Sequence, residues 1–251
     1  MQQEGEVRDG VVSGARVVEN PLDRRFVILV ANAKGGCGKT TLATNLASHF
    51  AVRNRQVTLL DLDPQQSATH WLRLREKTDA APIQGLQLSL EGSVSKGQIQ
   101  AMIQRSGEYL IIDTPAGLSG ATLDHVLSLC HVVLVPVLPS PIDIRATTRF
   151  LQAVMLTPSY RRRPRRLAVL ANRAKARTRV YHQLQQFLRS LKIPWLTTLR
   201  DTQYYVQASG EGTGLTELDS PRVRKDLQEW QRVMEWLEIQ RALIRSMPGF
   251  R

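Results

Sequence analysis

The fold of this chain is decided by residues 34–40, Lys34-Gly35-Gly36-Cys37-Gly38-Lys39-Thr40, which come just after the apolar run 26–30 (FVILV). A glycine-rich turn between a strand and a helix is built to hold phosphate, because its backbone N–H groups and the helix N-terminus point at the anion. In such a turn Lys39 adds positive charge, and the hydroxyl of Thr40 is placed on Mg²⁺. The common spacing G-x4-G-K-[ST] would require glycine where Ala33 stands. The full match is the variant K-G-G-x-G-K-[ST], which contains an additional lysine, Lys34.

Two further apolar runs end in carboxylates. The run 57–60 continues into Asp61-Leu62-Asp63, and because alternate residues of a strand point to one face, both carboxylates could lie near one Mg²⁺. The run 109–112 ends in Asp113, which has the form of a Walker B aspartate that holds Mg²⁺ through a water. We therefore predict that the magnesium residues are Thr40, Asp61, Asp63 and Asp113. Gly117 would give the loop after Asp113 the freedom to sense a γ-phosphate.

Together these motifs resemble the ParA/MinD family of dimeric ATPases, over roughly residues 26–240. The resemblance implies ATP and Mg²⁺ as cofactors and an ATP-dependent homodimer, in which Lys34 contacts the nucleotide of the opposite subunit. It also implies that Asp63 belongs to the first switch region and orients or activates the attacking water. The catalytic residues implied are thus Lys34, Lys39 and Asp63. The segment 135–145 also resembles the family, and we expect it to help position the dimer interface.

An asparagine after a late strand recognises adenine in relatives, which indicates Asn172. A strand-terminal asparagine that merely forms a turn is the alternative. The predicted nucleotide-binding residues are Lys34, Gly35, Gly36, Cys37, Gly38, Lys39, Thr40, Thr41 and Asn172.

Apolar runs and helical stretches alternate along the whole chain. Strands are expected near 26–31, 57–61, 86–90, 109–113, 131–137, 166–171 and 194–199. This alternation predicts an α/β fold: a mostly parallel twisted sheet with helices on both faces, of the P-loop NTPase type, with nucleotide at the carboxyl ends of the strands. Residues 1–24 are polar and we expect a flexible extension. Residues 25–251 then form one ATPase domain with a long C-terminal helix, and the extension is too short for a helix-turn-helix domain.

Composition limits the class of protein. The 251 residues are 42% hydrophobic, enough for one large α/β core. The chain has two cysteines without metal-binding spacing, which favours a reduced, cytoplasmic protein. No apolar stretch approaches the roughly 20 residues of a membrane span, and the N-terminus shows no signal-peptide core.

Positive charge is concentrated in one segment. Residues 144–200 contain fourteen Lys or Arg and no Asp or Glu, whereas the whole chain has a net charge of +12. Such a one-sided field is typical of a surface that binds polyphosphate without reading sequence, although a solvated charge run is the simpler alternative. We predict non-specific binding to nucleoid DNA through Arg161, Arg162, Arg163, Arg165, Arg166, Lys175, Arg177 and Arg179.

The C-terminal stretch has an apolar stripe at helical spacing, which includes Val223, Leu227, Trp230, Met234 and Leu237. The stripe favours packing on the body or in a dimer. Residues 237–251 are also basic and amphipathic, and MinD-type relatives bind membrane through such a helix, so a membrane-cycling regulator is the alternative function. The Asp-Pro-Gln form of the first switch and the far upstream start of the stripe argue against it.

A nitrogenase-type iron protein shares this phosphate loop but requires a cluster cysteine shortly after the Walker B strand, and Cys130 lies too far along. The resemblance therefore implies a ParA-like ATPase that positions a cargo: a plasmid, a chromosome region, or an assembly such as a carboxysome or chemoreceptor cluster. Hydrolysis is expected to be slow and to be stimulated by DNA and by a ParB-like or adaptor partner.

Overall fold

The computed structural model of the chain describes residues 25–90, 96–163 and 165–246, so the predicted extension 1–24 lies outside the described residues. Seven strands form one sheet that is parallel throughout, in the order β3-β2-β4-β1-β5-β6-β7. The strands are β1 (Phe26–Val30), β2 (Val57–Asp61), β3 (Gln84–Gln87), β4 (Tyr109–Asp113), β5 (Val132–Val137), β6 (Arg166–Ala174) and β7 (Trp195–Arg200). The predicted α/β architecture is confirmed, and the strands lie close to the positions expected from the apolar runs.

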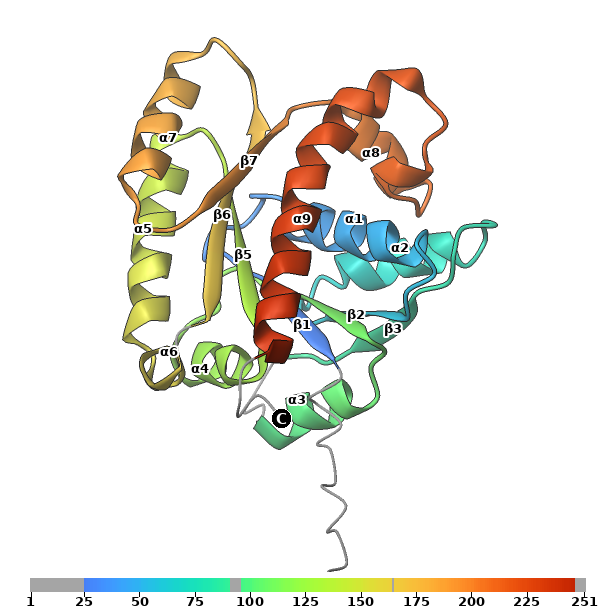
Figure 1. The fold of residues 1–251 in the computed structure, drawn as a ribbon, viewed down its shortest axis with the longest axis horizontal. Helices are drawn as coiled ribbons and strands as arrows, with labels where there is room; N and C mark the ends of the chain where they lie inside the picture. The colour runs from blue at the N-terminus through green and yellow to red at the C-terminus, as the bar shows by residue number, and fades with distance from the viewer. Residues whose placement is uncertain (1–24, 91–95, 164, 247–251) are drawn as a thin grey trace, which may run out of the picture.

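Helices cover both faces of the sheet (Figure 1). They are α1 (Lys39–Ala51), α2 (Ser67–Arg75), α3 (Lys96–Gln104), α4 (Gly120–Leu129), α5 (Pro141–Leu156), α6 (Pro158–Arg162), α7 (Arg179–Ser190), α8 (Gln203–Gly210) and α9 (Arg224–Ser246), with short 3-10 turns at Leu215–Glu217 and Pro221–Val223. Alternate residues of β1 show the division. Phe26, Ile28 and Val30 pack in one core with α1, α2 and α9, whereas Val27 and Leu29 pack in a second core with α3, α4, α5 and α7. Burial on both faces explains why the central strands β1, β2, β4 and β5 read as nearly continuous apolar runs.

The position of β1 determines where a ligand can bind. β1 lies between β4 and β5, and the chain leaves it toward β2 on one side and reaches β5 on the other. In open α/β sheets the crevice at such a switch point, at the carboxyl ends of the strands, is the usual binding place. The phosphate-loop residues 34–40 follow β1 at this point.

The long helix α9 crosses the sheet face beside β7 (Figure 1). Its residues Trp230, Val233, Leu237 and Ile244 are buried in the core that α1 also joins. Most of the apolar stripe is therefore used within this chain. Across the described ranges, no helix is both long and apolar enough to cross a membrane.

Candidate functional site: a phosphate cleft at the carboxyl edge of the sheet

A cleft of about 1080 Å³ opens at the carboxyl ends of the strands. The phosphate loop and the start of α1 form its floor, and the β2–α2 loop forms one side. The ends of β6 and β7 and helix α8 close the other side. The predicted residues that line this cleft are Gly35, Gly36, Gly38, Lys39, Thr40, Thr41, Asp63 and Asn172.

The phosphate loop needs its glycines. Gly36 and Gly38 have φ of 73° and 92°, in the left-handed region that other residues rarely adopt. A Cβ on Gly38 would lie 2.1 Å from Nδ2 of Asn172, so a side chain at this position would displace the Asn172 amide from its place against the loop. Helix α1 begins at Lys39 with no side-chain cap and no acidic residue in its first turn. Its unsatisfied N–H groups and its positive dipole end therefore remain available for an anion.

The two loop lysines differ in position, as the sequence predicted that their roles differ. Lys39 is 6% exposed and lines the cleft, where its ammonium donates to the carbonyl of Lys34 at 3.2 Å. Lys34 is half-exposed, does not line the cleft, and forms no ion pair with the described residues. Cys37 is buried and its thiol donates to the Lys34 carbonyl, so only the backbone of Cys37 belongs to the loop surface.

Thr40 and Asp113 form a pair suited to magnesium. The Thr40 hydroxyl donates to Oδ2 of Asp113 at 2.6 Å, and Oδ1 of this fully buried carboxyl has no hydrogen-bond partner among the described residues. Burial, assisted by the nearby Asp61 charge, raises the pKa of Asp113 to about 7, although the Thr40 hydrogen bond acts in the opposite direction. An unpartnered carboxylate oxygen beside a hydroxyl fits a hard cation. No group of three or more His, Cys, Asp or Glu side chains in the described ranges could hold a metal alone, so phosphate oxygens would have to complete the shell.

Asp61 does not fit the predicted role of a magnesium ligand. It is fully buried, and both of its oxygens are already used within the chain. Oδ1 accepts from the backbone N–H of Asp63 at 3.0 Å, and Oδ2 accepts from the N–H and the hydroxyl of Thr69 at 2.8 and 3.0 Å. By contrast, Asp63 is half-exposed, lines the cleft, and uses only Oδ1, which accepts from the N–H of Gln65. The two carboxylates of the D-x-D pair are therefore not equivalent.

Asn172 supports the phosphate loop. Its Nδ2 donates to the carbonyl of Cys37 at 2.8 Å, and its Oδ1 accepts from the N–H of Arg173, whose φ is 48°. Asn172 lies inside β6, in the stretch between Ala171 and Ala174 where the pairing with β7 is irregular, so the strand-terminal turn that was the alternative explanation is not found at this residue. Asn172 also lines the cleft, so a second N–H of its amide could still face a base. Contact with adenine remains a prediction.

Several residues of the cleft were missed by the sequence motifs. They are His70 and Leu74 of α2, Gln203 and Val206 of α8, and Asp201, which precedes α8. Nothing in their local sequence signals a binding site. They line the cleft only because the tertiary fold brings α2 and α8 together beside it.

The predicted DNA-contacting residues form two groups rather than one. Arg161, Arg162, Arg163 and Arg166 are exposed at the amino end of β6, whereas Lys175, Arg177 and Arg179 are exposed beyond its carboxyl end. At about 3.3 Å per residue, the first and last residues of β6 are about 26 Å apart. In Figure 1 the first group lies around α6 and the second at the start of α7, at opposite ends of the molecule.

Arg165 is a correction to the predicted DNA surface. It is 9% exposed, and its guanidinium donates to the carbonyls of Leu127 and Ser128 at the end of α4. These bonds satisfy carbonyls that the helix end leaves open. Lys175 is partly neutralised by Asp201, at 3.5 Å. Arg161, Arg162, Arg166, Arg177 and Arg179 form no ion pair with the described residues.

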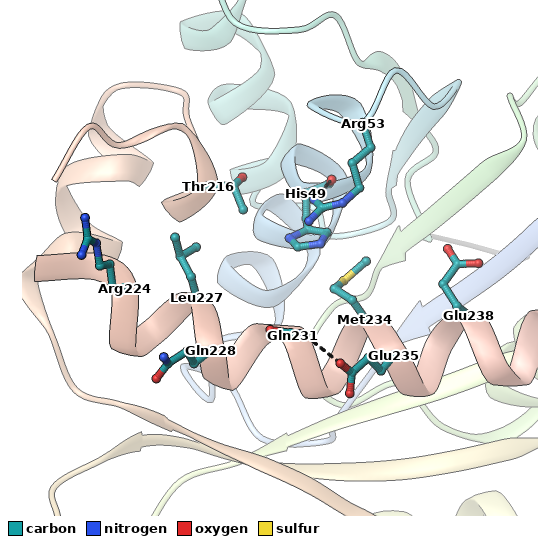
Figure 2. A pocket seen from close by; sticks show the side chains of 10 residues that line it. All are labelled: His49, Arg53, Thr216, Arg224, Leu227, Gln228, Gln231, Met234, Glu235 and Glu238. Atoms are coloured by element: carbon teal, nitrogen blue, oxygen red, sulfur yellow. Dashed lines mark hydrogen bonds between the residues drawn. The ribbon is translucent and has the colours of Figure 1, made fainter. Parts of the chain in front are cut away.

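A second hollow, of about 730 Å³, lies between the C-terminal end of α1 and one side of α9 (Figure 2). His49 and Arg53 face Met234 and the α9 carboxylates across it (Figure 2). Its charged side chains are two arginines and two glutamates, which cancel, and it contains no glycine turn or free helix N-terminus.

Comparison with known proteins agrees with this geometry. Residues 28–215 match the model of the "CobQ/CobB/MinD/ParA nucleotide binding domain". The chain is 31% identical over 198 residues to Maintenance of carboxysome distribution protein A of Halothiobacillus neapolitanus, covering 78% of this chain and 89% of the relative. The protein of the same name from Gloeobacter kilaueensis is 30% identical over 84% of this chain and 94% of its own.

Among solved structures, MinD of Aquifex aeolicus matches with a TM-score of 0.65 at 18% identity, over 84% of this chain and 97% of the other. A likeness at this identity shows the shared fold. The family model and the relatives in sequence both cover most of the chain, and the range matched by the family model includes the phosphate loop. The chain therefore belongs to the MinD/ParA family of nucleotide-binding domains.

Proposed function

We propose that this chain is an ATPase that dimerises when it binds ATP, attaches to DNA without sequence preference, and thereby positions a cargo. The family and the curated relatives support a ParA-type positioning ATPase at the coarse level. The finer proposal rests on one observation above all: five of the arginines predicted to contact DNA are exposed and form no ion pair with the described residues. Those arginines are Arg161, Arg162, Arg166, Arg177 and Arg179.

The cleft supplies the proposed nucleotide chemistry. Lys39 and the loop N–H groups would hold the β- and γ-phosphates, and Thr40 and Asp113 would hold Mg²⁺, which neutralises charge that develops on the phosphates. Asp63, whose Oδ2 makes no hydrogen bond with the described residues, would orient the attacking water. Lys34, which lies outside its own cleft, would contact the nucleotide of the opposite subunit in a sandwich dimer.

Dimerisation would make DNA binding depend on ATP. A monomer presents few unpaired arginines at either end of β6, and each phosphate contact contributes only weakly at physiological salt. Joining two subunits turns the second attachment into an intramolecular event, so the dimer binds more tightly than the monomer although each subunit presents the same arginines. Hydrolysis then separates the subunits and releases DNA. The ATP-bound dimer is thus the form that resides on the nucleoid.

The cargo we propose is a protein assembly of the carboxysome type, because two relatives that span most of this chain carry that function in their names. An adaptor or ParB-like partner would link cargo and ATPase and stimulate hydrolysis. The membrane-cycling alternative requires a free amphipathic C-terminal helix. α9 uses its apolar side in the core up to Ile244, which favours the DNA-binding proposal.

The decisive experiment measures binding to random-sequence duplex DNA with ATP, ADP and no nucleotide across a salt series. We expect ATP-dependent binding that falls steeply with salt, and the slope should decrease by about 0.9 for each phosphate that a variant no longer neutralises. Asp63→Ala should block hydrolysis and leave the ATP-bound dimer on DNA. If ATP binds but DNA does not at low salt, the DNA proposal is wrong, and anionic vesicles then test the membrane alternative.

Two charge reversals locate the DNA surface. Arg161→Glu/Arg162→Glu reverses two charges of the group at the amino end of β6, and Arg177→Glu/Arg179→Glu reverses two charges of the group at its carboxyl end. A matched control, Arg55→Glu/Lys225→Glu, reverses two exposed cations outside the basic segment. We expect at least one of the first two variants to lose DNA affinity and salt slope at unchanged ATP affinity. Equal losses in the control would show that only net charge matters.

A further inference from the structure

The segment between β2 and α2 is held by one carboxylate. Asp61, the last residue of β2, accepts from the N–H of Asp63 on one oxygen and from the N–H and hydroxyl of Thr69 on the other. All three distances lie between 2.8 and 3.0 Å, within the range of good hydrogen bonds. Asp61 thus joins the start of the β2–α2 loop, at Asp63, to the first turn of α2, at Thr69.

Helix α2 depends on this contact because it has no cap of its own. Its flanking residue Gln66 has φ of 55° and makes no side-chain cap bond. A capping side chain normally accepts from an N–H in the first helical turn, and Asp61 accepts from Thr69 in that turn. The carboxylate also lies at the positive end of the helix dipole. The cap is therefore supplied by the end of a neighbouring strand.

The same bonds restrain Asp63. Its N–H donates to Asp61, its Oδ1 accepts from the N–H of Gln65, and its carbonyl accepts from the N–H of Gln66 at 2.9 Å. Oδ2 is left without a hydrogen bond to the described residues on the wall of the cleft. The backbone of Asp63 is held on both sides while one carboxylate oxygen stays available to the contents of the cleft.

We propose that Asp61 and Thr69 are positioning residues that hold the Asp63 carboxylate at the geometry required to orient the attacking water. Asp61 does this by accepting three hydrogen bonds and not by touching the cation. The Thr69 hydroxyl adds the bond that a residue with only a backbone N–H could not supply. This inference rests on the proposed ATPase function and assigns two residues to its catalytic step.

Thr69→Val is the cleanest test, because it removes the hydroxyl, keeps the shape and the N–H, and changes no charge. A displacement of about 1 Å at a reacting group can lower a rate about 100-fold, so we expect kcat for ATP hydrolysis to fall about 10- to 100-fold. The dissociation constant of a fluorescent ATP analogue should stay within about twofold, since an interaction needed only for the chemical step affects kcat alone. The Mg²⁺ concentration at half-maximal rate should also be unchanged.

Further variants separate positioning from simple stability. Thr69→Ser restores a hydroxyl and should recover most of the rate. Thr148→Val is the matched control, because Thr148 is also a helical threonine whose hydroxyl donates a hydrogen bond, in its case to the backbone carbonyl of Ile144 on α5, away from the cleft. Asp61→Asn removes the same clamp, so the double variant with Thr69→Val should be no slower than Asp61→Asn alone.

The outcomes distinguish the two proposals. If the wild-type chain hydrolyses ATP and the Thr69→Val variant hydrolyses it equally fast, the positioning role is wrong and the ATPase function stands. A parallel loss of nucleotide affinity in Thr69→Val, or failure of serine to restore the rate, would also overturn it. A raised Mg²⁺ requirement in Asp61→Asn but not in Thr69→Val would return Asp61 to the metal shell. If the wild-type chain binds ATP but never hydrolyses it, with DNA and cell extract present, the ATPase function itself is refuted.

Discussion

Asp113→Asn tests whether burial of a carboxyl at the magnesium site costs the protein stability. The folded state holds the pKa of Asp113 at about 7, against an ordinary value of 3.8, mainly because the group is buried. The folded protein therefore binds more protons than the unfolded chain between these values. The contribution of this group to the free energy of unfolding therefore decreases as pH rises from about 4 to about 7. Above about pH 7 this contribution no longer changes with pH.

A shift of about 3 pKa units corresponds to about 4 kcal/mol at 1.36 kcal/mol per unit. Asparagine cannot ionise, so it avoids this loss, but its amide takes the place of the unpartnered Oδ1 and costs about 1–3 kcal/mol if it finds no acceptor. At about pH 8 without Mg²⁺ we expect Asp113→Asn to be more stable than the wild type by about 1–3 kcal/mol, a rise in Tm of about 2–12 °C.

Thermal unfolding of both proteins in EDTA, from about pH 4 to about pH 8, measures this difference, which should grow by about 4 kcal/mol over the range. With Mg²⁺ and a non-hydrolysable ATP analogue present, the wild type should become more stable than Asp113→Asn, because only the carboxylate compensates the charge of the cation. Asp219→Asn, which changes an exposed acid, serves as the control. A difference that does not depend on pH, or one that favours the wild type at high pH without Mg²⁺, would refute the reasoning.

Three other changes test the cleft and its surroundings. Lys39→Ala should abolish binding of a fluorescent ATP analogue, and retained affinity would contradict the loop assignment. Gly38→Ala should also prevent nucleotide binding, because its Cβ would lie 2.1 Å from the Asn172 amide, and the additional change Asn172→Ala should recover part of the affinity. Glu217→Ala leaves the buried guanidinium of Arg75 without its carboxylate and should cost about 3–5 kcal/mol in urea unfolding, whereas a loss below about 1 kcal/mol would make the pair dispensable.

Local sequence was sufficient for the fold class and for the phosphate loop. Buried parallel strands must be apolar on both faces, so the runs at 26–30, 57–60 and 109–112 were recognisable without any partner. The residues of the loop are continuous in sequence. The conformation of its glycines and the bond from Lys39 to the Lys34 carbonyl involve only neighbouring residues of the same loop. The pair of Thr40 and Asp113 could also be expected, because both follow neighbouring strands at one edge of the sheet.

Only the tertiary structure separated the roles of residues that look alike in sequence. Asp61 and Asp63 form one motif, but Asp61 is bound to Thr69 of the next helix and Asp63 faces the cleft. Likewise Arg165 is buried against α4, whereas Arg166 beside it is exposed. The physical reason is the same in each case. Composition and spacing specify which groups are charged, but hydrogen-bond partners and exposure depend on segments that meet only after the chain has folded.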